Sequence, residues 1–189
     1  MEAILQMAPD LVILDLSLPD FDGIEVLARV RDAGHRPKVL VVSGFANPHL
    51  VFRLERARVN GFVDKGIHAE AGLREALNAV LSNRTYFSDT YVRLQDERRR
   101  NPFSFDKLLT NQQLVILAFV AHRFGDGEIA ERLEISRRTA ETHRQTVMRK
   151  LGVRSVTELM RYAHESGFTS GSPPFVPPNP VRTHRLLDA

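Results

Sequence analysis

The sequence predicts an α/β domain followed by an all-α domain, and two observations lead to this division. In residues 1–87, short apolar runs alternate with segments whose apolar residues recur at helical spacing, which is typical of a parallel sheet. In residues 108–166, four short segments of helical periodicity follow one another, each with a capping residue before it. Residues 88–107 contain a charge run followed by Asn101-Pro102, and we expect a linker there.

Composition fits an ordinary globular protein and excludes several kinds of site. The 189 residues are 43% hydrophobic and 26% charged, which suits two small domains. The absence of cysteine excludes disulfides and thiol-ligated zinc, and none of the seven histidines pairs with another at metal-ligand spacing. The net charge of +3 and the pI near 9.6 are compatible with a nucleic-acid partner without requiring one.

No segment has the pattern of a membrane span or a secretory signal. Apolar runs such as Leu11–Leu14 and Val39–Val42 have strand length, and no run approaches the roughly 20 residues that a spanning helix needs. The N-terminal residues lack the basic region, apolar core and small-residue cleavage site of a signal peptide. We therefore expect a cytoplasmic protein without a membrane partner.

Three reactive side chains follow the strands that we expect in residues 1–87. The pattern predicts strands at residues 10–15, 38–43 and 61–63 and helices at residues 24–30, 48–58 and 69–81. Asp15, Ser43 and Lys65 lie at or just after the carboxyl ends of these strands. Ligands of an open α/β sheet bind at that edge, so the three side chains define a candidate site.

Together these side chains suit phosphoryl transfer to a carboxylate. Asp15 would be the nucleophile, Ser43 would bond one phosphoryl oxygen, and Lys65 would neutralise another oxygen and pair with Asp15 beforehand. Each residue alone has a simpler explanation, because strand-end aspartates often cap turns, Ser43-Gly44 suits a turn, and lysines usually solvate a surface. The three residues indicate phosphoryl chemistry only in combination.

Capping signals delimit the helices expected in residues 108–166. Thr110 and Gln113 have the spacing of a capping box, and Ser136 is placed to cap the third helix. The turn residues at 124–127 break the first helix, and we expect Asp126 to cap the second. Gly152, which tolerates left-handed backbone geometry, follows the third helix. Ser155 and Glu158 form a capping box at the start of the fourth helix.

The third helix has an apolar face and a polar face. At about 100° per residue, its apolar side chains fall on one side. These are Ala140, Val147 and Leu151. Six basic residues but one acidic residue lie between Arg137 and Arg154. A charged face usually only solvates a helix, but the caps and the tight turn at residues 134–136 favour a helix-turn-helix whose second helix enters the major groove of DNA.

The polar face has the side chains that base recognition uses. Arginine and glutamine can form two hydrogen bonds with one base edge, and threonine can offer its methyl group to thymine. We therefore expect double-stranded DNA as the partner. The residues expected to contact it are Arg137, Arg138, Thr139, Glu141, Thr142, Gln145, Arg149 and Lys150.

The same stretch resembles the LuxR/FixJ-type DNA-binding domain, through G-E-I-A-x-x-L-x-I-S-x-x-T-x-x-x-H-x-x-x-V-x-x-K-L-G-V-x-S. The resemblance implies four helices, of which the third reads DNA and the fourth helps to form a dimer. Two residues depart from the family, because Gln113 replaces a common glutamate and Glu141 replaces the lysine of many members. Two effects of Glu141 stay open, since a carboxylate can accept a hydrogen bond from a cytosine amino group or weaken the attraction to phosphate.

Residues 1–85 resemble the receiver domain of two-component response regulators, through L-D-L-S-L-P-D-F-D-G, V-V-S-G and G-F-V-D-K-G. The resemblance implies that a sensor histidine kinase phosphorylates Asp15 and that Ser43 and Phe62 are the hydroxyl and aromatic switch positions. It also implies Mg²⁺ as a cofactor, bound by Asp15 and by the backbone carbonyl of Ser17. A homodimer would form through the last helix or the receiver.

The chain departs from the receiver family at its start. Receivers are doubly wound domains of five strands, and their first strand ends in an acidic pair that holds Mg²⁺. We expect a partial domain that lacks the first two strands, the first helix and this pair, through a wrong start or a fragment rather than a degenerate gene. Asp20 and Asp22 lie in the loop after Asp15 and do not replace the pair. We therefore expect poor phosphorylation of Asp15 and an exposed apolar edge at residues 11–16.

The linker and the tail give weaker signals. Arg98–Arg100 would touch phosphates or, more simply, solvate the linker. Residues 167–189 hold five of the ten prolines and lack helical periodicity, so we expect a disordered tail. Its PPFVPP motif is of a kind that docks into aromatic grooves.

Three functions are compatible with these patterns. The first is a DNA-binding transcriptional regulator of a two-component phosphorelay, with impaired phosphorylation of Asp15. The second is an interaction module that no longer receives phosphate and modulates dimers of a full-length relative. The third, an aspartyl-phosphate phosphatase, requires D-x-D-x-T, whereas this chain has Asp15-Leu16-Ser17-Leu18. We therefore expect a regulator and not an enzyme.

Overall fold

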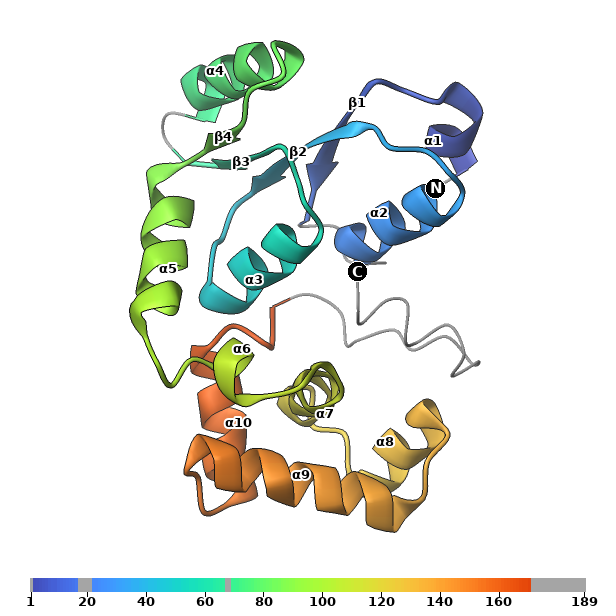
Figure 1. The fold of residues 1–189 in the computed structure, drawn as a ribbon, viewed down its shortest axis with the longest axis vertical. Coiled ribbons are helices and arrows are strands. Elements are labelled where there is room, and N and C mark those ends of the chain that lie inside the picture. The colour runs from blue at the N-terminus through green and yellow to red at the C-terminus, as the bar shows by residue number, and fades with distance from the viewer. Residues whose placement is uncertain (1, 17–21, 67–68, 171–189) are drawn as a thin grey trace. The chain divides into compact units, whose positions relative to one another are not determined.

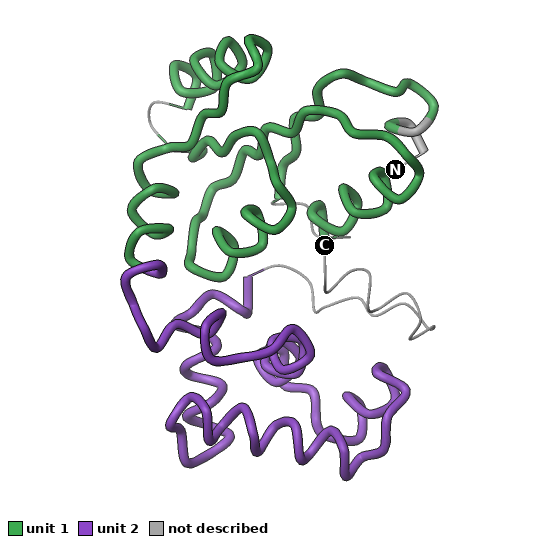
Figure 2. The backbone as a smooth tube through the Cα atoms, in the orientation of Figure 1, with its two compact units in different colours: residues 1–97 green, residues 98–189 purple. Residues whose placement is uncertain are grey.

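Two units, one α/β and one all-α, make up the part of the chain that the structure describes. The computed structural model describes residues 2–16, 22–66 and 69–170. The boundary separates Met1–Glu97 from Arg98–Ala189 (Figure 2). The first unit is built on a parallel sheet, and the described residues of the second form helices, so the predicted fold class is confirmed.

Four parallel strands form the sheet of the first unit, in the order β1-β2-β3-β4. The strands are β1 (Leu11–Asp15), β2 (Lys38–Ser43), β3 (Gly61–Asp64) and β4 (Tyr86–Phe87). The first three agree with the predicted strands. The fourth was not expected, because a strand of two residues is too short to show the alternation on which the prediction depends.

Helices connect the strands and cover both faces of the sheet. They are α1 (Glu2–Met7), α2 (Gly23–Asp32), α3 (Pro48–Arg56), α4 (Ala69–Leu81) and most of α5 (Asp89–Arg100). Side-chain oxygens of Asp22 and Asn47 accept backbone N–H bonds at the starts of α2 and α3, at 3.0 Å and 2.8 Å. Within this unit α2 and α3 lie on one face of the sheet and α4 on the other (Figure 1).

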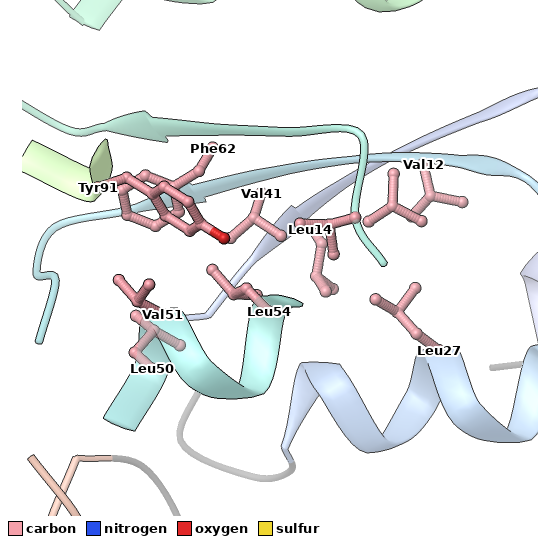
Figure 3. Packing of buried hydrophobic residues seen from close by; sticks show 11 residues of the cluster. Val12, Leu14, Leu27, Val41, Leu50, Val51, Leu54, Phe62 and Tyr91 are labelled. Atoms are coloured by element: carbon pink, nitrogen blue, oxygen red, sulfur yellow. The ribbon is translucent and has the colours of Figure 1, made fainter. Parts of the chain in front are cut away.

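Alternating side chains along the strands divide the core into two clusters. The larger cluster lies between the sheet, α2, α3 and the start of α5 (Figure 3). It contains Val12, Leu14, Leu27, Val39, Val41, Leu50, Val51, Leu54, Val59, Phe62 and Tyr91. The smaller cluster packs Leu40 and Val63 against Ala76 of α4. Leu40 thus faces away from its neighbours Val39 and Val41, as the two-residue period of a strand requires.

Strand β1 is an edge strand within the described sheet. It pairs with β2 from Leu11 opposite Lys38 to Asp15 opposite Val42, and no described strand pairs with its other edge. The Ile13 side chain on this strand is 52% exposed. The predicted apolar edge is therefore confirmed, and such edges are prone to pair with other chains.

The second unit contains α6 (Phe105–Leu108), α7 (Asn111–Ala121), α8 (Asp126–Leu133), α9 (Arg137–Leu151) and α10 (Val156–Glu165). The capping box of Thr110 and Gln113 is confirmed, as is the cap at Ser136, whose hydroxyl accepts a bond of 3.0 Å from Thr139 N–H. Gly152 ends α9 in the left-handed region, at a φ of 70°.

The prediction that Asp126 caps the second helix of this unit is wrong. The N-cap of α8 is Gly125, whose N–H donates to the Glu128 carboxylate at 2.8 Å. Asp126 is the first helical residue, and its carboxylate binds Arg144 of α9. The Asp126 side chain, which the sequence pattern assigned to the helix cap, therefore binds a residue of another helix instead.

The segment expected as a linker, residues 88–107, is largely helical. Helix α5 continues through the charge run to Arg100, and α6 follows four residues later. Arg93 pairs with Glu97 at 3.2 Å along the helix, while Arg98 is buried and paired with Asp106. The charge run is therefore helical, and within it Arg98 is buried in an ion pair, whereas Asp96, Glu97, Arg99 and Arg100 stay exposed as expected.

The expected disordered tail begins with ordered residues. Residues 167–170 form a turn after α10, and Phe168 is buried against Phe105 with ring centroids 5.0 Å apart. A single buried aromatic carries no periodicity, which is why the pattern did not reveal it. Residues 171–189, including the PPFVPP motif, lie outside the described residues.

Replacing Tyr91 with alanine should destabilise the first unit. Tyr91 is buried and packs against Phe87 and Phe62, with centroids 4.5 Å and 5.5 Å apart. We expect the free energy of unfolding in urea to fall by about 3 kcal/mol, the loss typical of a buried aromatic. The matched control is Val92→Ala on the same helix, because the Val92 side chain is 42% exposed. An equal loss in both variants would contradict the assigned packing.

Candidate DNA-binding surface and phosphoacceptor site

Helix α9 buries its apolar side and exposes the polar side. Ala140 and Val147 are fully buried, and Leu151 is half-buried. The eight residues predicted to contact DNA are all exposed along one helix: Arg137, Arg138, Thr139, Glu141, Thr142, Gln145, Arg149 and Lys150. The predicted division of the helix into an inner and an outer face is therefore confirmed. The contact of the eight exposed residues with DNA stays a prediction.

Hydrogen bonds along α9 orient several of these exposed side chains. The Thr142 hydroxyl donates to the Arg138 carbonyl at 2.8 Å, which fixes the side chain of the threonine on the helix. The Gln145 amide donates from Nε2 to Glu141 Oε1 at 3.1 Å. The hydroxyls of Ser136 and Thr139 lie 2.7 Å apart at the start of the helix. The outer face is thus partly ordered before any ligand binds.

An ion pair fixes α9 to α8. Arg144 donates from Nε and from its terminal nitrogen to the two oxygens of Asp126, both at 2.8 Å. The hydrogen bond from Arg144 lowers the pKa of Asp126, and the same bond raises the pKa of Arg144. A bidentate pair that is four-fifths buried holds two helices at a defined angle. Arg144 therefore supports the exposed face instead of belonging to it.

A second polar contact connects α9 to α7. The Lys150 ammonium donates to Gln113 Oε1 at 2.9 Å, and the same oxygen accepts the Thr110 N–H at 3.1 Å. Gln113 is buried, and its side-chain oxygen accepts both hydrogen bonds, so the same atom completes the capping box and holds the Lys150 ammonium. Lys150 was predicted to contact DNA, and in the structure α7 sets the position of its ammonium group.

The three predicted residues of the phosphoacceptor site lie at the carboxyl ends of neighbouring strands, with Asp15 and Ser43 as the last residues of β1 and β2 and Lys65 directly after β3. The ends of β1, β2 and β3 meet at the carboxyl edge of the sheet, which brings Asp15 and Lys65 together. Lys65 Nζ lies 2.5 Å from Asp15 Oδ2, and both side chains are more than one-third exposed. The predicted pairing of this acid and base is present, and the role of the two residues in phosphoryl transfer stays a prediction.

The two predicted switch residues are buried in different surroundings. Ser43 is fully buried, and its hydroxyl donates to the Phe45 carbonyl at 3.0 Å while accepting the Phe45 N–H at 3.3 Å. The Lys65 N–H donates to the Ser43 carbonyl at 2.8 Å, which ties the ends of β2 and β3 together. Phe62 is fully buried beside Tyr91. Both hydrogen bonds of the Ser43 hydroxyl thus go to the backbone of the turn that follows β2.

The receiver family generally binds Mg²⁺, and only part of the expected site lies among the described residues. This ion requires near-octahedral oxygen coordination, and proteins usually supply one or two carboxylates. No group of three or more histidine, cysteine, aspartate or glutamate side chains that could hold a metal occurs in residues 2–16, 22–66 and 69–170. Ser17, the predicted carbonyl ligand, and Asp20 lie outside these ranges.

No helix in the described part of the chain is long and apolar enough to cross a membrane. The longest, α9, has 15 residues, six of them basic or acidic.

Comparisons with known proteins agree with the division into two units. The family "Response regulator receiver domain" matches residues 1–78, and the family "Bacterial regulatory proteins, luxR family" matches residues 107–163. Fimbriae Z protein of Salmonella typhimurium is 34% identical over 158 residues, covering 82% of this chain and 73% of the relative. Oxygen regulatory protein NreC of Staphylococcus aureus is 28% identical over 171 residues, covering 86% of this chain and 78% of the relative.

The fold also resembles a solved structure of RcsB from Salmonella enterica serovar Typhimurium, bound to promoter rprA in the presence of the phosphomimetic BeF3⁻. The TM-score is 0.57 and the sequence identity 26%, and the match covers 85% of this chain and 78% of RcsB.

The ion pair between Asp126 and Arg144 should make stability depend on acid pH. Because the folded pKa of Asp126 lies below its unfolded value of about 3.9, the pair stabilises the fold above that pH and less as the pH falls through the folded value. Asp126→Asn should therefore lower the free energy of unfolding at neutral pH, and the difference from the parent protein should shrink below about pH 4.

Urea unfolding followed by circular dichroism at a series of pH values measures this difference. The matched control is Glu165→Gln, which removes an exposed carboxylate from α10. A difference between Asp126→Asn and the parent that stays constant down to pH 3 would show that the pair does not titrate in this way.

Proposed function

Because the chain belongs to the response regulators that carry a receiver domain and a LuxR-type DNA-binding domain, we propose that it regulates transcription by binding double-stranded DNA through α9. The observation that carries this proposal is the outward polar face of α9, opposite the buried Ala140 and Val147. A helix of this kind, preceded by the short α8 and a tight turn, suits insertion into the major groove. The domains are proposed at residues 1–87 and 108–166.

The exposed residues divide into those that read bases and those that bind the phosphate backbone. Arg138, Thr142 and Gln145 lie along the middle of the face, where side chains can reach base edges. Arg137 at the start of α9 and Arg149 near its end are placed for phosphates on either side of the groove. Thr139 and Lys150 complete the predicted contacts next to these two positions.

We further propose that two copies bind paired half-sites. Helix α10 buries Leu159 and Ala163 in its own unit but leaves Val156 41% exposed, so its outer side offers an apolar contact. Dimers of helix-turn-helix proteins place two recognition helices about one turn of DNA apart. The alternative dimer contact is the receiver unit.

Phosphorylation by a sensor histidine kinase is proposed to be inefficient. In the expected reaction an Asp15 oxygen attacks phosphorus, the new O–P bond forms, and the bond between phosphorus and the donor breaks. Lys65 supports this step, because its ammonium lies beside Asp15 and can neutralise a phosphoryl oxygen. The receiver family also uses Mg²⁺ to offset charge, and no cluster of three or more acidic or histidine side chains occurs among the described residues to support it.

Treating the protein with acetyl phosphate and Mg²⁺ tests this proposal. We expect intact-protein mass spectrometry to show labelling far below one phosphoryl group per chain, and this small label should disappear in Asp15→Asn. Near-complete, Mg²⁺-dependent labelling that Asp15→Asn abolishes would contradict it, and would mean that ligands outside the described residues complete the metal site.

The edge of β1 favours a second candidate function, an interaction module that modulates dimers of a full-length relative. The unpaired edge and the exposed Ile13 give the first unit a surface on which another chain can add a strand. This function does not require the chain to bind DNA by itself, so a DNA-binding assay with the purified protein separates the two candidates.

Alanine variants on α9 should affect DNA binding in two different ways. We expect Arg138→Ala to relax base preference, at about 1–3 kcal/mol for the base that it contacts. Arg149→Ala should weaken binding to all sequences alike and reduce the salt slope by about one unit. Binding-site selection followed by fluorescence anisotropy at several salt concentrations measures both effects. The control is Arg93→Ala, which removes an exposed charge from α5, and an equal effect from it would contradict these roles.

A further inference from the structure

Glu141 is an acidic residue on an otherwise basic helix face. It is exposed on α9 between Arg138 and Thr142, and within the described part of the chain it forms no ion pair. Arg144, one turn away, donates from Nε and one terminal nitrogen to Asp126 and from its other terminal nitrogen to Met148 Sδ at 3.6 Å, so it forms no ion pair with Glu141. A carboxylate that faces DNA phosphates is repelled by them, so its presence requires a compensating interaction.

Gln145 holds this carboxylate in a defined orientation. Its Nε2 donates to Glu141 Oε1 at 3.1 Å across one helical turn. An ionised carboxylate only accepts hydrogen bonds, so the glutamine amide must present its nitrogen to Glu141 and not its oxygen. The second carboxylate oxygen of Glu141 and the amide oxygen of Gln145 are then left as acceptors. Glu141 and Gln145 therefore present hydrogen-bond acceptors on the exposed face, whereas the arginine side chains around them present donors.

One base matches a group that only accepts. In the major groove guanine offers two acceptors, thymine offers an acceptor and a methyl group, and adenine offers a donor beside an acceptor. Cytosine alone offers an amino donor without a neighbouring acceptor. We propose that Glu141 determines specificity by accepting a hydrogen bond from the N4 amino group of a cytosine in each half-site, with Gln145 as its positioning residue. This proposal rests on the proposed function, because it requires α9 to lie in the major groove.

The competing explanation is that Glu141 only lowers affinity by repelling phosphates. Its removal would then strengthen binding to every sequence alike and steepen the dependence on salt. If it reads cytosine, its removal instead abolishes the preference at one position and leaves the other positions unchanged. The two explanations therefore differ in the pattern of selected bases and not only in affinity.

Binding-site selection with the full chain separates them. We expect the parent protein to favour cytosine at one position of each half-site by about fivefold or more over the other bases. Glu141→Ala should lose this preference, and Glu141→Gln should weaken it, since glutamine keeps one acceptor oxygen but presents a donor in place of the other. Gln145→Ala should weaken it. The control Glu131→Gln, an exposed acid on α8, should keep it.

A modified duplex tests the contact directly. Replacing the selected cytosine with 2-pyrimidinone, which lacks the N4 amino group, should weaken binding by the parent about fivefold or more and leave Glu141→Ala unaffected. An unchanged preference in both Glu141 variants, or equal sensitivity of parent and variant to the modified base, would overturn this inference while leaving the proposed function intact. Failure of the parent to bind any duplex at low salt would overturn both.

Discussion

The burial of one side of α9 determines what the second unit can present to a partner. Ala140 and Val147 have no exposed surface, and their position along the helix fixes the rotation of every other side chain on it. The small size of Ala140 lets α9 pack closely, and the bidentate bond from Arg144 to Asp126 then fixes its direction relative to α8. A functional face on a rigid helix is more sharply defined than one on a loop.

The first unit depends on a comparable constraint at the edge of its sheet. Parallel pairing of β1, β2 and β3 places their carboxyl ends together, and the backbone bond from Lys65 to Ser43 joins two of them. The side chains of Asp15 and Lys65 therefore meet although fifty residues separate them in the chain. The chemistry proposed at this edge follows from the order of the strands and not from any local motif.

Much of the architecture could be predicted, because local rules determine it. The caps at Thr110, Ser136 and Gly152 lie where short-range geometry requires them, and the three long strands show their period directly. What the sequence could not reveal depends on tertiary partners. Asp126 is a residue type that often caps helices, but in the structure its carboxylate pairs with Arg144. Phe168 is buried because Phe105 packs beside it. The exposed side chains of the candidate surface were predictable from helical periodicity, whereas the bond between Gln145 and Glu141 depends on side-chain orientation.

The uncharged side chain at position 113 has a consequence for the electrostatic field in front of α9. A carboxylate there would neutralise Lys150, whereas Gln113 holds the ammonium through a neutral oxygen and leaves its full positive charge in place. The unit thus retains one unit of charge at one end of the helix while Glu141 subtracts one near the middle. Relative to family members with glutamate at position 113 and lysine at position 141, the first exchange adds one unit of positive charge and the second removes two. The summed attraction for a polyanion therefore falls by one unit and shifts along α9 toward Lys150.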